Sequence, residues 1–231
     1  MATRKSNQKK GDETLVNLVE VSGQAQNFID KNKTLLTFGL GGLLLIVLGV
    51  FLYKNLYATP RQRDAVEQMF QAQAQFEKDS FKLALTNPGG GYSGFLDVID
   101  NYSGSKAANL SKYYAGICYL HLGEYDAAIS YLEDFSPAGD IIPAMKYGAL
   151  GDAYAEKGEL DNAMSQYQKA AKASSNEVIA PYYLKKVGML HEKNGNLAEA
   201  KTAYETIKND YATSSAASDI EKYIIRVSDS K

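Results

Sequence analysis

Residues 116–132, GICYLHLGEYDAAISYL, set a pattern that returns at residues 151–167, GDAYAEKGELDNAMSQY, and at residues 188–204, GMLHEKNGNLAEAKTAY. Each copy opens on a glycine, has a second glycine seven positions later and an alanine five positions after that, and ends on leucine or tyrosine. The second glycine is typical of a turn between two helices. The first glycine and the alanine let those helices approach closely, while the large final residue fills space toward the next helix. Because the copies lie 35 and 37 residues apart, the sequence predicts stacked helix pairs and an all-α fold.

The shared residues G-x-x-Y…G-x-[YL]-x-x-A-x-x-x-[YL] resemble the tetratricopeptide repeat, which has a period of about 34 residues. In the third copy His191 takes the tyrosine position, and the usual tryptophan and the usual proline are absent from all three copies. The resemblance implies a TPR-like α-solenoid, in which the first helix of each repeat lines a concave face that binds other polypeptides.

Weaker signals extend this stack in both directions. Four positions recur at a constant offset of 109, pairing Gly91, Phe95, Val98 and Tyr102 with Ala200, Tyr204, Ile207 and Tyr211. Thr59 followed by Pro60 predicts a helix start with Thr59 as N-cap, and the sequence NPGGG at 87–91 predicts that this helix ends near Thr86. We therefore expect a linker helix and a degenerate first repeat in residues 58–108. Residues 109–231 are expected to hold three repeats and a capping helix over 214–227.

Residues 35–53, LLTFGLGGLLLIVLGVFLY, contain no charge, and thirteen of the nineteen are Leu, Ile, Val or Phe. As a helix they would span roughly 28 Å, close to the hydrocarbon thickness of a bilayer. The apolar run is too long for a signal peptide and lacks a suitable cleavage site after it. The sequence thus predicts one transmembrane helix within residues 34–57.

Lysine and arginine are distributed unevenly about this span. Six lie before it, at positions 4, 5, 9, 10, 31 and 33, and three lie in the twenty or so residues after it, at positions 54, 61 and 63. This bias favours a cytoplasmic N-terminus. In a bacterium, the protein would then be a single-pass inner-membrane protein with residues 54–231 in the periplasm. In the head, residues 1–33, we expect a disordered stretch over 1–11, followed by either an amphipathic helix or a disordered tail with local helical bias.

The composition offers little for catalysis. The net charge is −2 without a clustered basic face, so no nucleic-acid partner is expected. The reactive side chains have ordinary packing interpretations: Cys118 as a core residue, His121 at a helix end and His191 at a repeat position. No His, Cys, Asp or Glu cluster has metal-ligand spacing, and no catalytic triad can be nominated. We predict no enzyme activity and no cofactor.

Recognition of polypeptides is the remaining function. The positions expected to face the concave side offer apolar, aromatic and a few charged side chains, namely Tyr113, Ile117, His121, Asp152, Tyr182, Lys185 and Met189. Methionine and tyrosine suit contacts with varied extended segments. Equally, these residues can serve only to pack neighbouring helices. Within the span, Gly42 and Gly49 share one face and can admit a partner helix, or they simply face lipid.

The layout as a whole is similar to another family. The segment NFIDKNK at 27–33 leads into a glycine-rich span that ends in FLYKN at 51–55, before a Gln/Ala-rich helix and degenerate repeats. This resembles the ancillary subunit of the bacterial Sec translocon. The resemblance implies association with translocon subunits, a membrane-anchored peptidyl-prolyl isomerase or periplasmic chaperones, and hand-over of unfolded exported polypeptides. The alternatives are a structural scaffold for a division, wall-synthesis or secretion complex, and a mitochondrial outer-membrane receptor with cytosolic repeats.

Overall fold

The computed structural model describes the backbone of residues 3–229 and the side chains of residues 23–229, except residue 25. Within these residues every regular element is helical, which confirms the all-α class. The elements are α1 (Thr3–Leu52), η1 (Tyr53–Ala58), α2 (Thr59–Phe76), α3 (Phe81–Thr86), α4 (Phe95–Asn101), α5 (Lys106–His121), α6 (Tyr125–Asp134), α7 (Ile141–Glu156), α8 (Leu160–Ala173), α9 (Ile179–Lys193), α10 (Leu197–Asp210), η2 (Ser215–Asp219) and α11 (Ile220–Asp229). The chain divides into two units, Met1–Thr59 and Pro60–Lys231.

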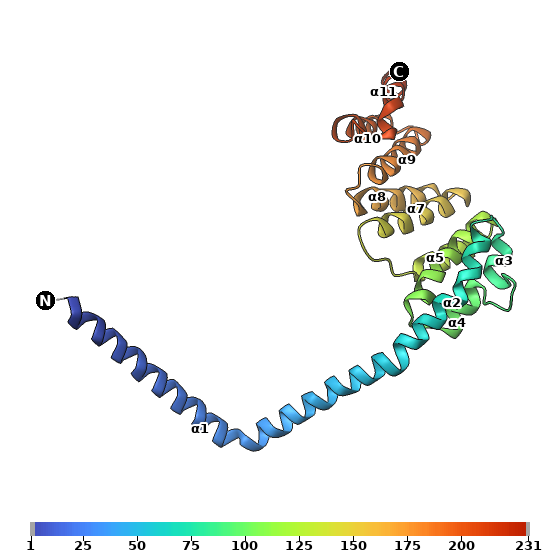
Figure 1. Ribbon diagram of the computed structural model, residues 1–231. Coiled ribbons are helices and arrows are strands. Elements are labelled where there is room, and N and C mark those ends of the chain that lie inside the picture. Colours follow the sequence, from blue (N-terminus) through green and yellow to red (C-terminus); the bar gives the residue numbers. More distant parts are fainter. Residues whose placement is uncertain (1–2, 230–231) are drawn as a thin grey trace. The chain divides into compact units, whose positions relative to one another are not determined.

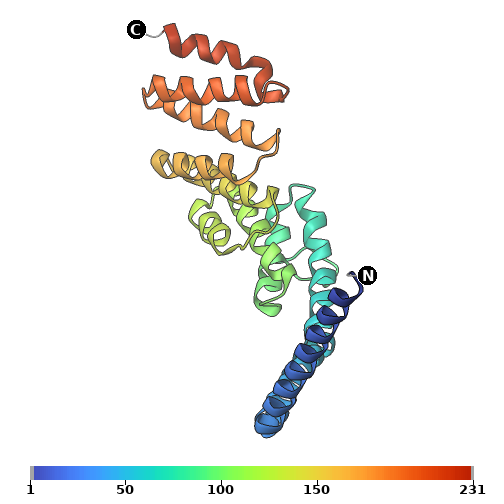
Figure 2. The same cartoon turned by 90° about the vertical axis from the view of Figure 1, so that its left-hand side faces the viewer.

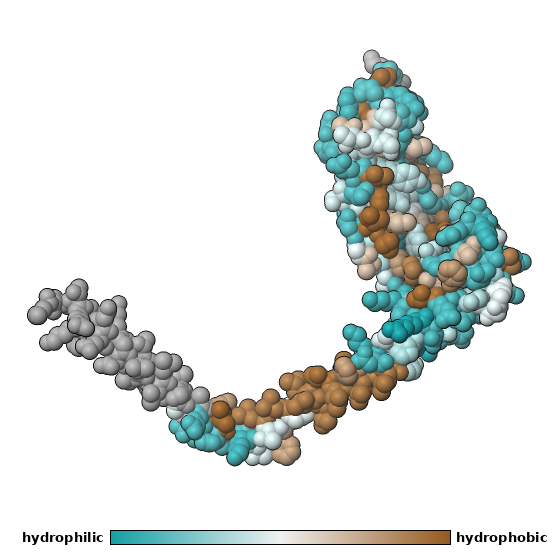
Figure 3. All heavy atoms as spheres, in the orientation of Figure 1, coloured by the Kyte–Doolittle hydropathy of each residue, from teal (hydrophilic) through white to brown (hydrophobic). Residues whose placement is uncertain are grey.

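The first unit contains the candidate membrane span. Helix α1 carries the apolar residues 35–52, which form a continuous hydrophobic surface in Figure 3, and Tyr53 is the first residue of η1. The helical run Gln26–Phe76 includes an 18-residue window of mean hydropathy 2.6 with none of it buried, so by length and composition it can cross a membrane. The predicted disorder at 1–11 is wrong for residues 3–11, which belong to helix α1. Residues 1–2 lie outside the described part, as do the side chains that would test an amphipathic face over 12–22.

Helix α2 begins at Thr59, where the sequence predicts a helix start, but the predicted N-cap is wrong, because the backbone is helical on both sides of this residue. The backbone of Thr59 is helical and its N–H donates to the carbonyl of Lys54, five residues back. This i to i−5 pattern defines the π-helical turn η1, which lies directly before Pro60. Since proline has no N–H, it cannot make the ordinary i to i−4 bond. The π turn η1 lets the helical backbone continue into Pro60, whereas the Thr59-Pro60 sequence suggests that a separate helix starts there.

The prediction of a single helix from 60 to 86 is wrong, because the chain forms two helices here. Helix α2 ends at Phe76 and α3 begins at Phe81. Between them Asp79 adopts a left-handed backbone conformation, with φ of 56°, and the N–H of Ser80 donates to the carbonyl of Gln75 at 2.9 Å. Aspartate is among the few residues other than glycine that enter this region readily.

The second unit, Pro60–Lys231, contains the repeats and is hereafter called the repeat unit. Helix α2 belongs to its core. Its buried side chains Ala65, Met69 and Ala72 pack in a cluster that includes Phe95 and Val98 of α4. Four side chains on its polar face bond to the backbone of loops and helix ends. Arg61 donates to the carbonyl of Asn101 at 2.6 Å and Gln75 to that of Pro88 at 3.0 Å. The side-chain oxygens of Gln62 and Gln68 accept from the N–H groups of Lys106 and Ser93, at 2.7 and 3.2 Å. The glutamine-rich composition of this helix therefore has a structural role in the first repeat.

The three predicted repeats form the pairs α5–α6, α7–α8 and α9–α10, which follow one another along the repeat unit in Figure 1. In each pair the first glycine lies directly against the large residue sixteen positions later. A Cβ built on Gly116 would lie 2.6 Å from Leu132, one on Gly151 would lie 2.5 Å from Tyr167, and one on Gly188 would lie 2.3 Å from Tyr204. Figure 2 shows α9, α10 and α11 in successive layers at the end of the unit.

Each pair is joined by the same turn. Gly123, Gly158 and Gly195 have φ of 78°, 80° and 76°, a region that glycine occupies without a steric penalty. The residue after each glycine donates its N–H to a carbonyl five residues back, on Tyr119, Tyr154 and His191 respectively, at 2.8 to 2.9 Å. This is the hydrogen bond of a glycine-terminated helix end.

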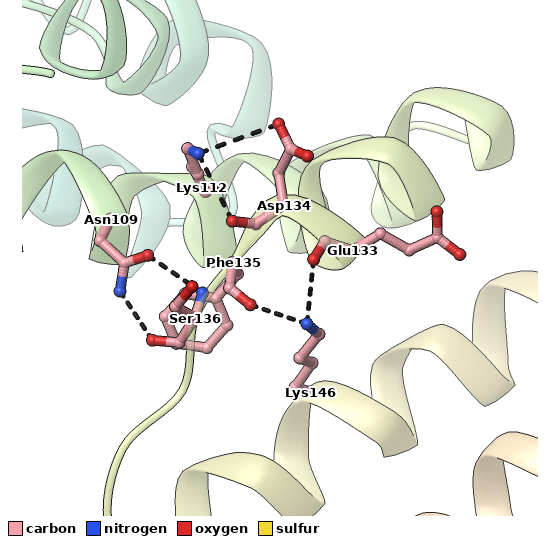
Figure 4. Close-up of polar contacts among 7 residues, drawn as sticks. All are labelled: Asn109, Lys112, Glu133, Asp134, Phe135, Ser136 and Lys146. Atoms are coloured by element: carbon pink, nitrogen blue, oxygen red, sulfur yellow. Dashed lines mark hydrogen bonds and ion pairs between the residues drawn. The ribbon is translucent and has the colours of Figure 1, made fainter. Parts of the chain in front are cut away.

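Polar side chains fix the junction between the first two of these pairs (Figure 4). The side chain of Asn109 makes two bonds with the backbone of Ser136, at 2.8 and 3.0 Å. Lys146 of α7 donates to the carbonyls of Glu133 and Phe135 at 3.0 and 2.7 Å. These bonds satisfy carbonyls at the end of α6 and hold the buried Phe135 beside the ring of Tyr113, 5.4 Å between centroids.

Candidate protein-interaction pocket

The repeat unit contains a pocket of about 600 Å³ formed by α7, α9 and η2. Hereafter it is the α7–α9 pocket, and it is lined by Met145, Val178, Ile179, Tyr182, Tyr183, Lys185, Lys186, Met189, Ser215 and Ala216. Four of these apolar side chains are substantially exposed: Val178 by 64 %, Tyr182 by 51 %, Met189 by 48 % and Met145 by 37 %. Figure 3 shows apolar side chains gathered in a strip on one face of the repeat unit.

Local interactions at the start of α9 place these side chains. The side-chain oxygen of Asn176 accepts from the N–H groups of Val178 and Ile179 at 2.9 and 3.2 Å. These two donors would otherwise be unsatisfied at a helix N-terminus. Residues 182, 185, 186 and 189 then follow at spacings of three and four, so they share one face of α9.

Lys186 lies in a network that joins two repeats. Its Nζ donates to Oδ1 of Asp152 at 2.5 Å, and the hydroxyl of Tyr167 donates to the same oxygen at 2.5 Å. The ammonium group also lies 5.0 Å from the ring centre of Tyr167 and 5.2 Å from that of Tyr182. Burial acts to lower the pKa of Lys186, but the hydrogen bond to Asp152 and its charge outweigh burial and the pKa is raised. Burial and the bond to Asp152 likewise raise the pKa of Tyr167.

Lys185 has a corresponding partner on the other side of the pocket. Its Nζ lies 2.6 Å from Oδ1 of Asp219, at the end of η2, and 4.5 Å from the ring centre of Tyr223. Oδ2 of Asp219 pairs with Lys222 at 2.8 Å. The hydrogen bonds from Lys185 and Lys222 lower the pKa of Asp219 to about 2. Asp219 is therefore a carboxylate at any physiological pH.

A second glycine contact shapes the floor of the pocket. The hydroxyl of Tyr183 lies against Gly148 of α7, where an added Cβ would fall 1.9 Å from that oxygen. Burial raises the pKa of Tyr183, with a smaller contribution from the charge of Asp152. A side chain at position 148 would displace the Tyr183 ring, so this glycine is part of the pocket's shape.

The site residues predicted from the sequence, for polypeptide binding and for helix packing in the membrane, lie in three places. Tyr182, Lys185 and Met189 line the α7–α9 pocket, and Asp152 lies directly behind Lys186. Tyr113 and Ile117 are half-buried on α5 and do not line it, while His121 is exposed at the end of α5 with its ring stacked on Phe81 at 4.4 Å. Gly42 and Gly49 lie on α1 in the other unit, with open space where a Cβ would be.

Sequence reasoning did not single out several of the lining residues, among them Val178, Ile179, Tyr183, Lys186, Ser215 and Ala216. Adjacent residues of a helix point about 100° apart. The repeat pattern therefore placed Lys185 on the concave face and did not include Lys186. Ser215 and Ala216 lie within the capping helix predicted over 214–227, but the structure places them in the 3₁₀ turn η2, and the α-helix α11 begins only at Ile220. Their signal was Ser214, whose hydroxyl accepts from the N–H of Ala217 at 3.2 Å and thereby turns this segment back toward α9.

The reactive side chains of the repeat unit are engaged in packing. Cys118 is fully buried and burial raises its pKa to about 12. Among the residues that the structure describes, no group of three or more His, Cys, Asp or Glu side chains is placed to hold a metal ion.

Comparison with known proteins agrees with the helix pairs. Tetratricopeptide-repeat models match residues 111–136, 147–177 and 186–214, which include most of α5–α6, α7–α8 and α9–α10. A search of curated proteins finds no match to the chain. The predicted tetratricopeptide-repeat solenoid is thus confirmed, with one long apolar N-terminal helix as a candidate membrane span. The chain contains tetratricopeptide repeats, and these repeats indicate a protein–protein interaction module.

Proposed function

We propose that this protein is a membrane-anchored interaction module that holds extended polypeptide segments in the α7–α9 pocket. The observation that supports this most directly is the exposure of Val178, Tyr182 and Met189 around one concavity. Exposed apolar side chains gathered in this way mark interaction sites more often than scattered ones do. A volume of about 600 Å³ is in the range that accommodates a small ligand or a few peptide side chains. Methionine and tyrosine adapt to varied partners.

We further propose that the module acts at the bacterial Sec translocon, with the head in the cytoplasm and the repeats in the periplasm. The excess of lysine and arginine before residues 35–53 supports this orientation. The resemblance of the whole layout to the ancillary translocon subunit supports the location. The partners would be translocon subunits, a membrane-anchored peptidyl-prolyl isomerase or periplasmic chaperones, and the clients would be unfolded exported polypeptides.

Site-specific crosslinking tests the binding site. A photoreactive amino acid replaces Met189 in the full-length protein, in membranes in which export of a secretory polypeptide has been arrested. Thr202 of α10 is the control position, because it is exposed and lies outside the pocket. We expect crosslinks to the exported polypeptide from position 189 and few from position 202. Equal yields from the two positions would contradict the proposed site.

The location is tested separately. Affinity purification of the solubilised protein should recover translocon or chaperone subunits, and protease added to intact spheroplasts should degrade the repeat unit only if it faces outward. Recovery of division or wall-synthesis proteins in their place would favour the scaffold alternative. Protection of the repeats in spheroplasts would contradict the proposed orientation.

A further inference from the structure

The charged side chains that line the α7–α9 pocket are both cations, Lys185 and Lys186. The rest of the lining consists of apolar, tyrosine and serine side chains, and within the described part of the chain no carboxylate contributes to it. Lys185 follows Tyr182 by three residues and precedes Met189 by four, so the three share one face of α9. The pocket therefore presents a positive charge on the same face as its exposed apolar side chains.

The two lysines are held in different ways. Nζ of Lys186 lies 2.5 Å from Oδ1 of Asp152, and in the described part of the chain this is the ion pair that Asp152 makes. Nζ of Lys185 lies 2.6 Å from Oδ1 of Asp219, while Oδ2 of Asp219 lies 2.8 Å from Nζ of Lys222. Asp219 is thus shared by two cations, of which only Lys185 lines the pocket.

The double pairing of Asp219 allows Lys185 to change its partner. Lys185, Lys222 and Asp219 together carry two positive charges and one negative charge, so the group can accommodate one more carboxylate. If Lys185 turned toward a carboxylate in the pocket, Asp219 would keep its bond to Lys222, and no acidic group would be left without a cation. The side chain of Lys185 is 22 % exposed, and its flexible stem and three N–H donors suit such a change. Lys186 is less free, because its departure would leave Asp152 without its cation.

From this arrangement we propose that the pocket takes apolar polypeptide segments that carry one acidic side chain, with Lys185 as the residue that binds the carboxylate. The inference rests on the proposed function, because it names the class of segment that the same pocket takes. The apolar side chains of such a segment lie on Tyr182 and Met189, and its carboxylate pairs with Lys185 between them. Charge complementarity of this kind selects among partners more than it adds affinity.

The test uses the full-length protein in nanodiscs of zwitterionic phosphatidylcholine and two peptides that differ in one charge. The neutral peptide is Gly-Ser-Ile-Tyr-Gln-Tyr-Ile-Ser-Gly, and the acidic peptide has Glu in place of the central Gln. Both are amidated at the C-terminus and carry an uncharged fluorophore at the N-terminus, so the glutamate side chain supplies the only carboxylate. Fluorescence anisotropy measures binding, with empty nanodiscs subtracted. The wild type should bind the acidic peptide about two- to fivefold more tightly at low salt, and this preference should shrink as salt is added.

Three variants identify the cation that is responsible. Lys185→Gln should abolish the preference and leave the affinity for the neutral peptide within about twofold. Lys222→Gln should also reduce the preference, because Asp219 then depends on Lys185 alone. Lys208→Gln is the matched control: it removes a cation from a pair with Glu221 outside the pocket and should leave the preference unchanged.

The possible outcomes separate this inference from the proposed function. Equal affinity of the wild type for both peptides, or weaker binding of the acidic one, would overturn the inference and leave the pocket as a peptide site. So would a preference that survives Lys185→Gln, one that Lys222→Gln does not change, or one that Lys208→Gln removes. Binding of neither peptide by the wild type would overturn both the inference and the proposed function.

Discussion

Gly188 and Tyr204 show how individual residues fix the distance between the paired helices. Tyr204 is fully buried, and its hydroxyl donates to Glu192 at 3.1 Å, so its ring has little freedom to move. Gly188 lies against that ring with no room for a Cβ. The same relation holds for Gly151 with Tyr167, which explains why glycine occurs in the middle of helices whose propensity it lowers.

Gly188→Ala should therefore destabilise the protein despite the better helix propensity of alanine. Overpacking typically costs about 1–3 kcal/mol, and alanine returns about 0.5–1 kcal/mol, so we expect a net loss of about 0.5–2 kcal/mol in the free energy of unfolding. Chemical denaturation measures it. Tyr204→Leu in the same background makes room for the methyl group, so the two changes should be less than additive. A gain in stability from Gly188→Ala alone would contradict the close contact.

The buried thiol of Cys118 gives a second test at this scale. Its pKa is raised to about 12, so at pH 8 the reactive thiolate is about a thousandfold scarcer than in an unfolded chain. Because Cys118 is the one cysteine in the sequence, labelling with a thiol reagent reports on it alone. We expect very slow labelling of the native protein and rapid labelling in denaturant. Fast labelling under native conditions would show that α5 is not packed as described.

The ion pairs of Asp219 should make stability depend on pH in a defined direction. Its pKa is lowered to about 2 in the folded protein, against about 3.9 in an unfolded chain. The folded state therefore favours the carboxylate, so the stabilisation is complete above about pH 5 and is lost as the pH falls from 4 toward 2. Thermal unfolding should show a lower midpoint for Asp219→Asn than for wild type at pH 7, and the two midpoints should converge near pH 2. A constant difference across this range would exclude the ion pairs as its cause.

At the scale of elements, helix α2 is an integral part of the first repeat. Met69 is 4 % exposed and receives a hydrogen bond from the hydroxyl of Ser111 on α5 at 3.2 Å. Phe70 is the next residue along the chain, and it is 66 % exposed. Adjacent positions of one helix thus face the core and the solvent.

This contrast predicts opposite outcomes for two truncations. Met69→Ala should lower the free energy of unfolding by about 2–4 kcal/mol, because it leaves a cavity beside Phe95 and Val98. Phe70→Ala removes a larger side chain but should change stability by no more than about 0.5 kcal/mol. Urea denaturation of both variants provides the comparison. Similar losses from the two changes would mean that α2 does not pack through this face.

The helix pairs could be predicted where a glycine at a given position allows only one local structure. The turn glycines at 123, 158 and 195 require positive φ, and the glycine–tyrosine pairs require close helices, so the repeats were evident from the sequence. The segment around Pro60 was not, because a proline after threonine can begin a helix or follow a π turn with the same local sequence. The wall formed by η2 was also hidden, since it depends on how the capping segment packs on α9.

At the scale of the whole chain, the apolar residues 35–53 carry the prediction of a membrane anchor. The full-length protein should stay in the membrane pellet after extraction with alkaline carbonate, and a variant lacking residues 35–53 should move to the supernatant. The expected stabilisation in lipid comes from thirteen large apolar side chains at up to about 0.3–0.6 kcal/mol each, which no charge within the segment opposes. Release of the full-length protein by carbonate would contradict a transmembrane anchor.

Among the described residues, α7 contacts α5, α6, α8 and α9, so this repeat packs on its neighbours along the chain. In the proposed function, a load between the bilayer and a client held at α9 would pass through the repeats in series. In the first repeat, α2 is bonded to its surroundings through Arg61, Gln62 and Gln68. Under tension the strength of this connection would depend on the first repeat. If the first repeat opened, the chain between the span and α9 would become longer, while the C-terminal repeats would stay folded and bound to the client.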